Sequence, residues 1–147
     1  MKLPCIGLCL VAITLLAVRA ECATRTVRSR RDGGSGSLRQ TLARSRAGDT
    51  IILRTNGFLV LKSELVLDKN ITLRGVPAWR TFLTSEVNSR ILRVVEGVTA
   101  TLDGLVLQEG SAVAMGAGAG GAILNEGTLL VRNCDLFANT KGLAVVN

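Results

Sequence analysis

The charged side chains that could do chemistry lie at a fixed spacing. Arg74, Asp103 and Arg132 follow one another at intervals of 29 residues, and Asp135 comes soon after Arg132. An aspartate between two arginines can form an anion-binding or catalytic cluster, or it can belong to a ladder of opposite charges on the outer face of neighbouring strands. We interpret the spacing as a ladder, and keep Asp103, Arg132 and Asp135 as the catalytic candidates of this chain.

The residue types that usually bind metals or cofactors are scarce. The chain has no histidine, the commonest metal ligand and general base. Its carboxylates are scattered and are not spaced as calcium ligands. The glycine-rich stretch 116–121 leads into a strand-like segment, 122–125, whereas a nucleotide-binding fingerprint opens a helix. We therefore expect no metal and no cofactor.

An internal repeat must position the charged residues. Segments 71–75, 100–104 and 129–133 superimpose at an offset of 29 residues, and 120–125 matches 142–147 at an offset of 22. Segments of the first set carry two apolar side chains spaced by two, followed by Gly or Asn. Such self-similarity indicates stacked coils. Alternation of apolar and polar residues within each segment predicts parallel strands with one face inside a solenoid.

The register also predicts which side chains face inward. Leu73, Leu102 and Val131 share one column, and Cys134 stacks with Leu105 in another. These residues should be buried because successive side chains of a strand point to opposite faces. A buried Cys134 is poorly placed to pair with Cys22, so we expect no disulfide between the two.

Glycine and asparagine recur where the strands end. Gly75, Gly104 and Asn133 share one position of the repeat, and Gly110 and Asn139 share another. These two residue types tolerate left-handed backbone. The pattern predicts a tight bend at both positions.

The first 20 residues have the pattern of a secretory signal peptide. Lys2 precedes an apolar run over 5–18, and Val18-Arg19-Ala20 resembles a cleavage site. The run is too short for a comfortable membrane span, although a short anchor is the alternative. We expect a secreted or cell-surface protein with no stable membrane span after signal cleavage.

Residues 21–36 form a basic, glycine-rich lead-in that we expect to be exposed and partly mobile. Four arginines lie in this segment, but no aromatic residue accompanies them to stack on bases. We therefore expect no nucleic-acid partner.

A capping helix is predicted over 37–47. Ser37 can cap it, and Gln40 completes a capping box. Leu38 and Leu42 fall on one face, suited to lie across the open end of stacked coils.

We expect the coils to occupy 48–147 and to be incomplete at the C-terminus, because the sequence there ends in a strand-like segment with no capping element after it. An uncapped parallel edge exposes unpaired backbone and apolar side chains. We expect either a fragment or truncated product, or a cover for that end such as end-to-end association through the uncapped coil.

Several motifs resemble a known group. Residues 36–43, followed by 48–51, are similar to the N-terminal cap and first strand of secreted right-handed parallel β-helix proteins of the pectin-lyase-like group, which includes bacterial surface and autotransporter-like proteins. Residues 120–123 resemble the Gly-Gly-Ala-Ile tetrapeptide of chlamydial polymorphic outer-membrane proteins. The resemblance implies an all-β fold, a right-handed parallel β-helix of about three to four coils with a short N-terminal capping helix.

The resemblance says less about activity than about fold. It implies a structural or surface-interaction role, adhesin-like, with an extracellular glycan or a surface protein as partner. The alternative is a polysaccharide lyase, such as a pectate lyase, or a hydrolase, reduced or truncated. Lyases of the group hold calcium with acidic residues and abstract a proton with Arg or Lys, so calcium is a cofactor only under that alternative. A nonfunctional truncated member of a larger set is the third possibility. We lean against an enzyme.

Overall fold

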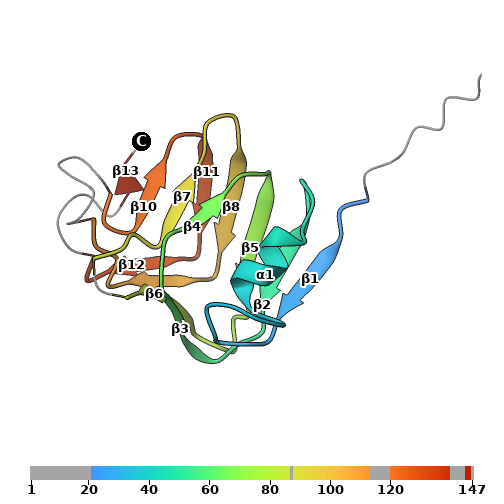
Figure 1. Ribbon diagram of the computed structural model, residues 1–147, viewed down its shortest axis with the longest axis horizontal. Coiled ribbons are helices and arrows are strands. Elements are labelled where there is room, and N and C mark those ends of the chain that lie inside the picture. The colour runs from blue at the N-terminus through green and yellow to red at the C-terminus, as the bar shows by residue number, and fades with distance from the viewer. Residues whose placement is uncertain (1–20, 87, 113–119, 140–144, 147) are drawn as a thin grey trace, which may run out of the picture.

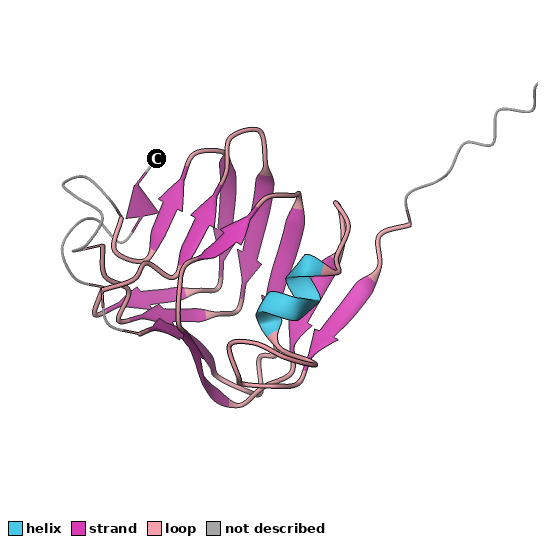
Figure 2. Cartoon of the chain, in the orientation of Figure 1, coloured by secondary structure: helices cyan, strands magenta, loops and turns pink. Residues whose placement is uncertain are grey.

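The computed structural model describes residues 21–86, 88–112, 120–139 and 145–146 (Figure 1). The predicted signal peptide and the glycine-rich stretch 113–119 lie outside the described residues. Apart from one short helix near the N-terminus, the regular elements of the described chain are all strands (Figure 2). That helix is too short to cross a membrane.

Three parallel sheets run along the molecule. Sheet A contains, in order, β1 (Thr24–Val27), β2 (Thr50–Leu53), β5 (Ile71–Gly75), β8 (Thr99–Asp103) and β11 (Thr128–Arg132). Sheet B contains β3 (Gly57–Leu61), β6 (Thr81–Ser85), β9 (Val106–Gln108) and β12 (Asp135–Phe137). Sheet C contains β4 (Leu65–Leu67), β7 (Leu92–Val94), β10 (Ile123–Asn125) and β13 (Val145–Val146).

Each coil from β2 onward gives one strand to each sheet, which makes a solenoid of about four coils. The prediction of a parallel β-helix with a short N-terminal helix is confirmed. Strand pairing also confirms both offsets of the repeat. Leu102 pairs with Leu73 on one side and with Val131 on the other, and Ile123 pairs with Val145.

The core fills the space between the three sheets. Leu73 and Leu102 are fully buried in the inward column of sheet A. Val131 continues the same column but is 38% exposed, so the prediction that it is buried is wrong. Cys134 is half-buried rather than buried. Both belong to the last coil, where a neighbouring coil covers one side only.

The first turn position was predicted correctly for two of its three members. Gly104 and Asn133 adopt the left-handed region, with φ angles of 68° and 50°. Gly75 does not, because it is the last residue of β5 and remains extended. A side chain at Gly75 would collide with the carbonyl oxygen of Gly104. Glycine is required there by a close approach of two backbones and not by a bend.

The second turn position was predicted one residue too late. The left-handed residues are Glu109 and Ala138, with φ angles of 59° and 53°. Asn139 acts through its side chain instead. Its Oδ1 accepts a hydrogen bond from the backbone N–H of Gly110 at 2.9 Å, and its Nδ2 donates to the carbonyl oxygen of Leu107 at 3.2 Å.

The helix α1 (Leu38–Ala43) is shorter than the predicted 37–47. Ser37 is its N-cap and accepts a hydrogen bond from the backbone N–H of Gln40 at 3.2 Å. The Gln40 side chain accepts in turn from the backbone N–H of Gly36 at 3.3 Å, which gives a variant of the predicted capping box. Leu38 and Leu42 are buried in the core, so the helix covers the N-terminal end of the coils as predicted.

The lead-in 21–36 is more ordered than its composition suggests. Four of its residues form β1, which pairs in register with β2. Asp49 holds this strand in place: its carboxylate accepts hydrogen bonds from the backbone N–H of Ala23 at 2.8 Å and from Arg25 Nε at 2.7 Å. The prediction of an exposed, mobile segment is therefore wrong for β1.

Candidate functional site

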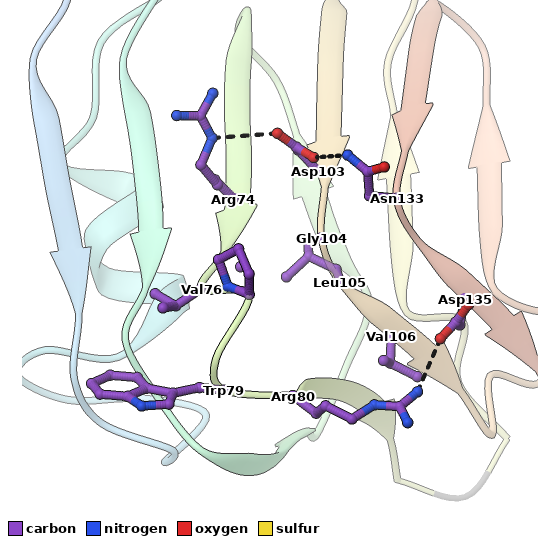
Figure 3. A pocket seen from close by; sticks show the side chains of 12 residues that line it. Arg74, Val76, Trp79, Arg80, Asp103, Gly104, Leu105, Val106, Asn133 and Asp135 are labelled. Atoms are coloured by element: carbon purple, nitrogen blue, oxygen red, sulfur yellow. Dashed lines mark hydrogen bonds and ion pairs between the residues drawn. The ribbon is translucent and has the colours of Figure 1, made fainter.

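An open groove follows the corner at which sheet A turns into sheet B (Figure 3). Its volume is about 480 Å³. The groove spans three coils, and its lining residues are Arg74, Gly75, Val76, Pro77, Trp79, Arg80, Asp103, Gly104, Leu105, Val106, Asn133 and Asp135.

The wall of the groove is a corner of unusual length. Residues 104–105 and 133–134 join the two sheets in the third and fourth coils, whereas 76–80 form the corner of the second coil. This longer corner is folded back by a hydrogen bond of 2.8 Å from the N–H of Trp79 to the carbonyl oxygen of Val76. Pro77 fixes one φ angle within the turn. The Trp79 side chain is left 40% exposed at the edge of the groove (Figure 3).

Two ion pairs lie along the groove, one between the neighbouring strands β5 and β8 and one from the corner of the second coil to β12 in the fourth. Arg74 Nε lies 3.4 Å from a carboxylate oxygen of Asp103, and Asn133 Nδ2 donates to the other oxygen of Asp103 at 2.9 Å. The Arg80 guanidinium lies 3.0 Å from the carboxylate of Asp135. Arginine and carboxylate side chains thus alternate along the groove, and each of the two carboxylates accepts at least one charge-assisted hydrogen bond or ion pair.

The Arg80 side chain has a second contact. Its guanidinium carbon lies 5.7 Å from the ring centroid of Phe82, which is within the range of a cation–π interaction. Phe82 stacks in turn on Phe58, with ring centroids 4.8 Å apart. Arg80 is therefore held between an aromatic ring and Asp135, which fixes its position at the edge of the groove.

The structure brings two of the three candidate residues together. Asp103 and Asp135 both line the groove. Arg132 is exposed on β11 and does not line it; within the described part of the chain it forms no ion pair with Asp103. The ladder of three charges predicted from the sequence is therefore an ion pair of Arg74 and Asp103 only. Asn133 occupies the second oxygen of Asp103 instead.

Sequence analysis overlooked the residues that make the wall. No strand was expected over 75–89, but β6 lies within that segment. The sequence TFLTS is rich in aromatic and β-branched residues, and this composition, which favours a strand, was the available signal. Arg80 and Trp79 stand just before that strand and gain their positions from it.

The acidic side chains of the groove are occupied by neighbouring side chains. Both of its carboxylates are engaged by arginine or amide groups. Among the described residues, no three His, Cys, Asp or Glu side chains lie together as metal ligands. What the groove offers is an exposed aromatic ring beside fixed hydrogen-bond donors and acceptors, the composition of a small binding site.

Cys22 and Cys134, the two cysteines among the described residues, lie at opposite ends of the solenoid, and both are free thiols. Cys22 precedes β1 and Cys134 follows β11, which places them about 19 Å apart along the axis at the usual spacing of strands. A disulfide requires Cα atoms closer than about 7 Å. Burial raises the pKa of the Cys134 thiol, which donates to the carbonyl oxygen of Arg132 at 3.1 Å.

Comparison with known proteins shows no family for this fold. A scan against protein-family models and searches of curated proteins and of solved structures found no match. The pectin-lyase-like and chlamydial resemblances therefore rest on short motifs alone. The fold itself is a parallel β-solenoid.

Proposed function

We propose that this protein is an extracellular surface-interaction protein and that its groove binds a glycan. The observation that carries the proposal is Trp79, an exposed aromatic ring at the edge of a groove with fixed polar side chains. A buried position would explain a tryptophan by packing alone. At 40% exposure, a large part of this apolar side chain stays in contact with water, and packing within the fold does not account for that part.

Sugar rings match both parts of the groove. Their C–H faces pack on aromatic rings, and their hydroxyl groups exchange hydrogen bonds with charged and amide side chains. Arg74, Asp103 and Asn133 present such groups in a row that is fixed by their mutual contacts. Because these side chains are already ordered, binding costs little additional side-chain entropy.

The test is a glycan array with the purified protein, followed by calorimetry with the best ligand. Replacing Trp79 with Ala should weaken binding at least about tenfold, because stacking on an exposed ring contributes about 1.5 kcal/mol beyond simple area burial. Val66→Ala is the matched control, since Val66 is similarly exposed but lies on β4, away from the groove. Absence of glycan binding, or equal binding by Trp79→Ala, would refute the proposal.

A polysaccharide lyase is the second candidate, favoured by one observation: Asp103, Asp135 and Arg80 line the same groove. Under this alternative the carboxylates would bind calcium and an arginine would abstract a proton. The assay is formation of unsaturated product from polygalacturonate with and without calcium. Calcium-dependent product that disappears in Arg80→Ala would establish the lyase and displace the binding role.

A further inference from the structure

The three sheets differ at the N-terminal end of the solenoid. Sheet A begins with β1, one strand before the first complete coil. The corresponding place beside β4 in sheet C is taken by α1, where Lys69 Nζ lies 3.4 Å from the carbonyl oxygen of Leu42. The corresponding place beside β3 in sheet B is crossed by residues 28–36, which contain no strand. Sheet B thus begins with an unpaired strand.

The free edge of β3 carries unused hydrogen-bonding groups. The N–H of Gly57 donates to the carbonyl oxygen of Arg80, and the carbonyl oxygen of Leu61 accepts from the N–H of Glu86, so both residues point their backbone groups toward β6. Backbone direction alternates along a strand. The N–H and C=O groups of Phe58 and Val60 therefore point away from β6, and no described residue bonds to them across the edge.

A trough of about 560 Å³ lies along this part of β3. Residues 30–33 form one wall, and Val60, Lys62 and Glu86 form the other. Phe58 and Val60 are 51% and 40% exposed, so apolar side chains stand beside the free backbone groups. Gly33 and Gly34 have open space where side chains would stand, so no side chain extends the wall at this point.

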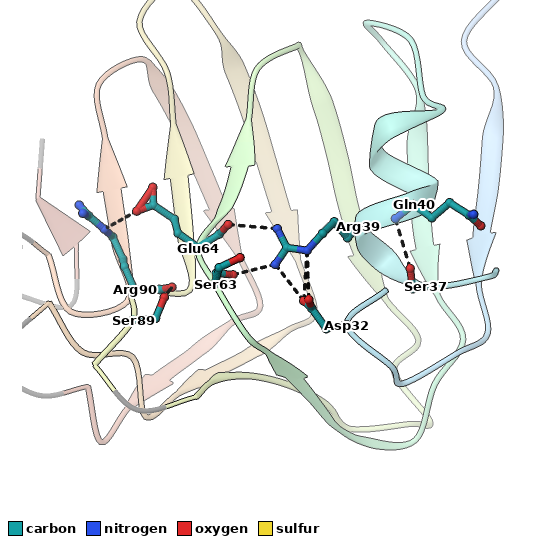
Figure 4. A network of polar contacts seen from close by, with 8 residues as sticks. All are labelled: Asp32, Ser37, Arg39, Gln40, Ser63, Glu64, Ser89 and Arg90. Carbon is teal, nitrogen blue, oxygen red and sulfur yellow. Dashed lines mark hydrogen bonds and ion pairs between the residues drawn. The ribbon is translucent and has the colours of Figure 1, made fainter. Parts of the chain in front are cut away.

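The wall formed by residues 30–33 is held in place by a network of polar contacts (Figure 4). Arg39 Nη2 donates to Asp32 at 2.8 Å and to the carbonyl oxygen of Ser63 at 2.7 Å, while Nη1 donates to the carbonyl oxygen of Glu64 at 3.2 Å. Asp32 is thereby tied to α1 and to the turn after β3. The trough is bounded by a fixed segment rather than by a loose one.

The charge of the trough is positive. Arg30, Arg31 and Lys62 form no ion pair among the described residues, whereas Asp32 is neutralised by Arg39. The Arg30 guanidinium lies next to Gly57, the first residue of β3, on the side where a side chain would otherwise stand. An occupant that pairs with the β3 edge would meet three available cations and one acidic side chain, Glu86.

We infer that the β3 edge binds an extended, acidic peptide segment of a partner protein, which adds to sheet B as a fifth strand. Main-chain hydrogen bonds to Phe58 and Val60 supply the pairing, and carboxylates of the peptide match Arg30, Arg31 and Lys62. Strand addition to an open edge is an established mode of peptide recognition, in which side-chain pockets set specificity. This site is separate from the groove beside Trp79 and does not depend on its ligand.

The experiment uses the purified protein and a labelled peptide of alternating glutamate and valine, with binding followed by fluorescence anisotropy. The same peptide N-methylated at alternate residues lacks donors along one edge, and a lysine–valine peptide reverses the charge. We expect binding of the first peptide only. Equal binding of the N-methylated peptide would reduce the site to a charged surface and overturn strand addition, and absence of binding by the first peptide would overturn the proposal.

Two variants localise the effect. Val60→Pro removes one edge donor without touching the bonds to β6, since proline is tolerated on an edge strand whose N–H faces outward; binding should fall at least about tenfold, for one lost hydrogen bond and a blocked edge. Lys62→Glu should weaken binding about fivefold or more. Arg132→Glu on β11 is the charge-matched control and should leave binding unchanged.

Thermal unfolding of Val60→Pro close to that of the wild type shows that the strand persists. Wild-type affinity in both Val60→Pro and Lys62→Glu would exclude β3 as the binding site.

Discussion

The two ends of the described solenoid differ in how the inward column of sheet A is covered. At the N-terminal end the inward column of sheet A begins with Arg25, whose guanidinium binds Asp49, a carboxylate that is only 1% exposed. Helix α1 adds two buried leucines over the same end of the core. At the other end the column reaches Val131, which is partly exposed. Register places a side chain in a column, but a covering element on both sides is needed to bury it.

The largest expected effect comes from truncating side chains in the inward column of sheet A. Leu102→Ala should destabilise the protein by about 2–5 kcal/mol, because Leu102 is fully buried between two coils and its truncation leaves a cavity. Val131→Ala removes fewer atoms from a partly exposed position and should cost well under half as much. Urea denaturation of both variants gives the free energies of unfolding. Equal losses would show that the last coil is as tightly packed as the third.

The repeated coils could be predicted from the sequence because their stabilising pattern recurs. Leu73 and Leu102 occupy the same place in successive coils, so each supports the assignment of the other. The N-terminal strand could not be found this way. Of its two inward residues Val27 is buried, but Arg25 is charged and pairs with Asp49, 24 residues away, so neither local propensity nor periodicity marks the pair. A single long-range contact of charged groups leaves no repeat in the sequence.

The groove was foreseen only in part, for the same reason. Asp103 and Asp135 lie on repeated strands, so the register places them near one another. Trp79 and Arg80 belong to a corner that occurs once, and their positions follow from how 76–80 fold back on themselves. The offset of 29 residues carries no information about such an insertion.

The second prediction concerns the charged closure at the N-terminal end. Hydrogen bonds from the backbone N–H of Arg46, from Arg25 and from the backbone N–H of Ala23 lower the pKa of Asp49 from 3.8 to about 2. A lowered pKa in the folded state means that this carboxylate stabilises the protein above about pH 4, and that the contribution is lost as the pH falls toward 2. Asp49→Asn should lower the unfolding temperature at pH 7.

The pH dependence is the sharper readout for this variant. Between about pH 4 and pH 2 the wild type should lose stability more steeply than Asp49→Asn, because the variant has no proton to take up at that position. Asp68→Asn, at an exposed carboxylate paired with Lys69, is the control and should keep the wild-type slope. Identical slopes for all three proteins would mean that Asp49 does not close the end of the core.

A third prediction tests how much the helix contributes to that closure. Ser37→Ala removes the side chain that caps α1 and should cost about 1 kcal/mol. Ser37→Asp keeps an acceptor at the cap and should recover most of the loss, although Ser37 is buried and the larger side chain needs room. Circular dichroism during thermal unfolding measures both variants. If Ser37→Asp is as unstable as Ser37→Ala, the serine contributes by packing rather than by capping.

The smallest expected effect lies midway between the two ends, on the outer face. In the outward column of sheet A, Arg74 and Asp103 form an ion pair at 3.4 Å with one side chain 53% exposed, whereas Arg132 on the next strand is not paired with that aspartate in the described chain. A double-mutant cycle of Arg74→Ala and Asp103→Ala should give a coupling of about 0.2–1 kcal/mol, the usual range for exposed pairs. The cycle of Asp103→Ala and Arg132→Ala should give none. A larger coupling in the second cycle would restore the three-membered ladder. If the free energy of unfolding of Asp103→Ala is close to that of the wild type, a loss of glycan binding in this variant can be assigned to the groove.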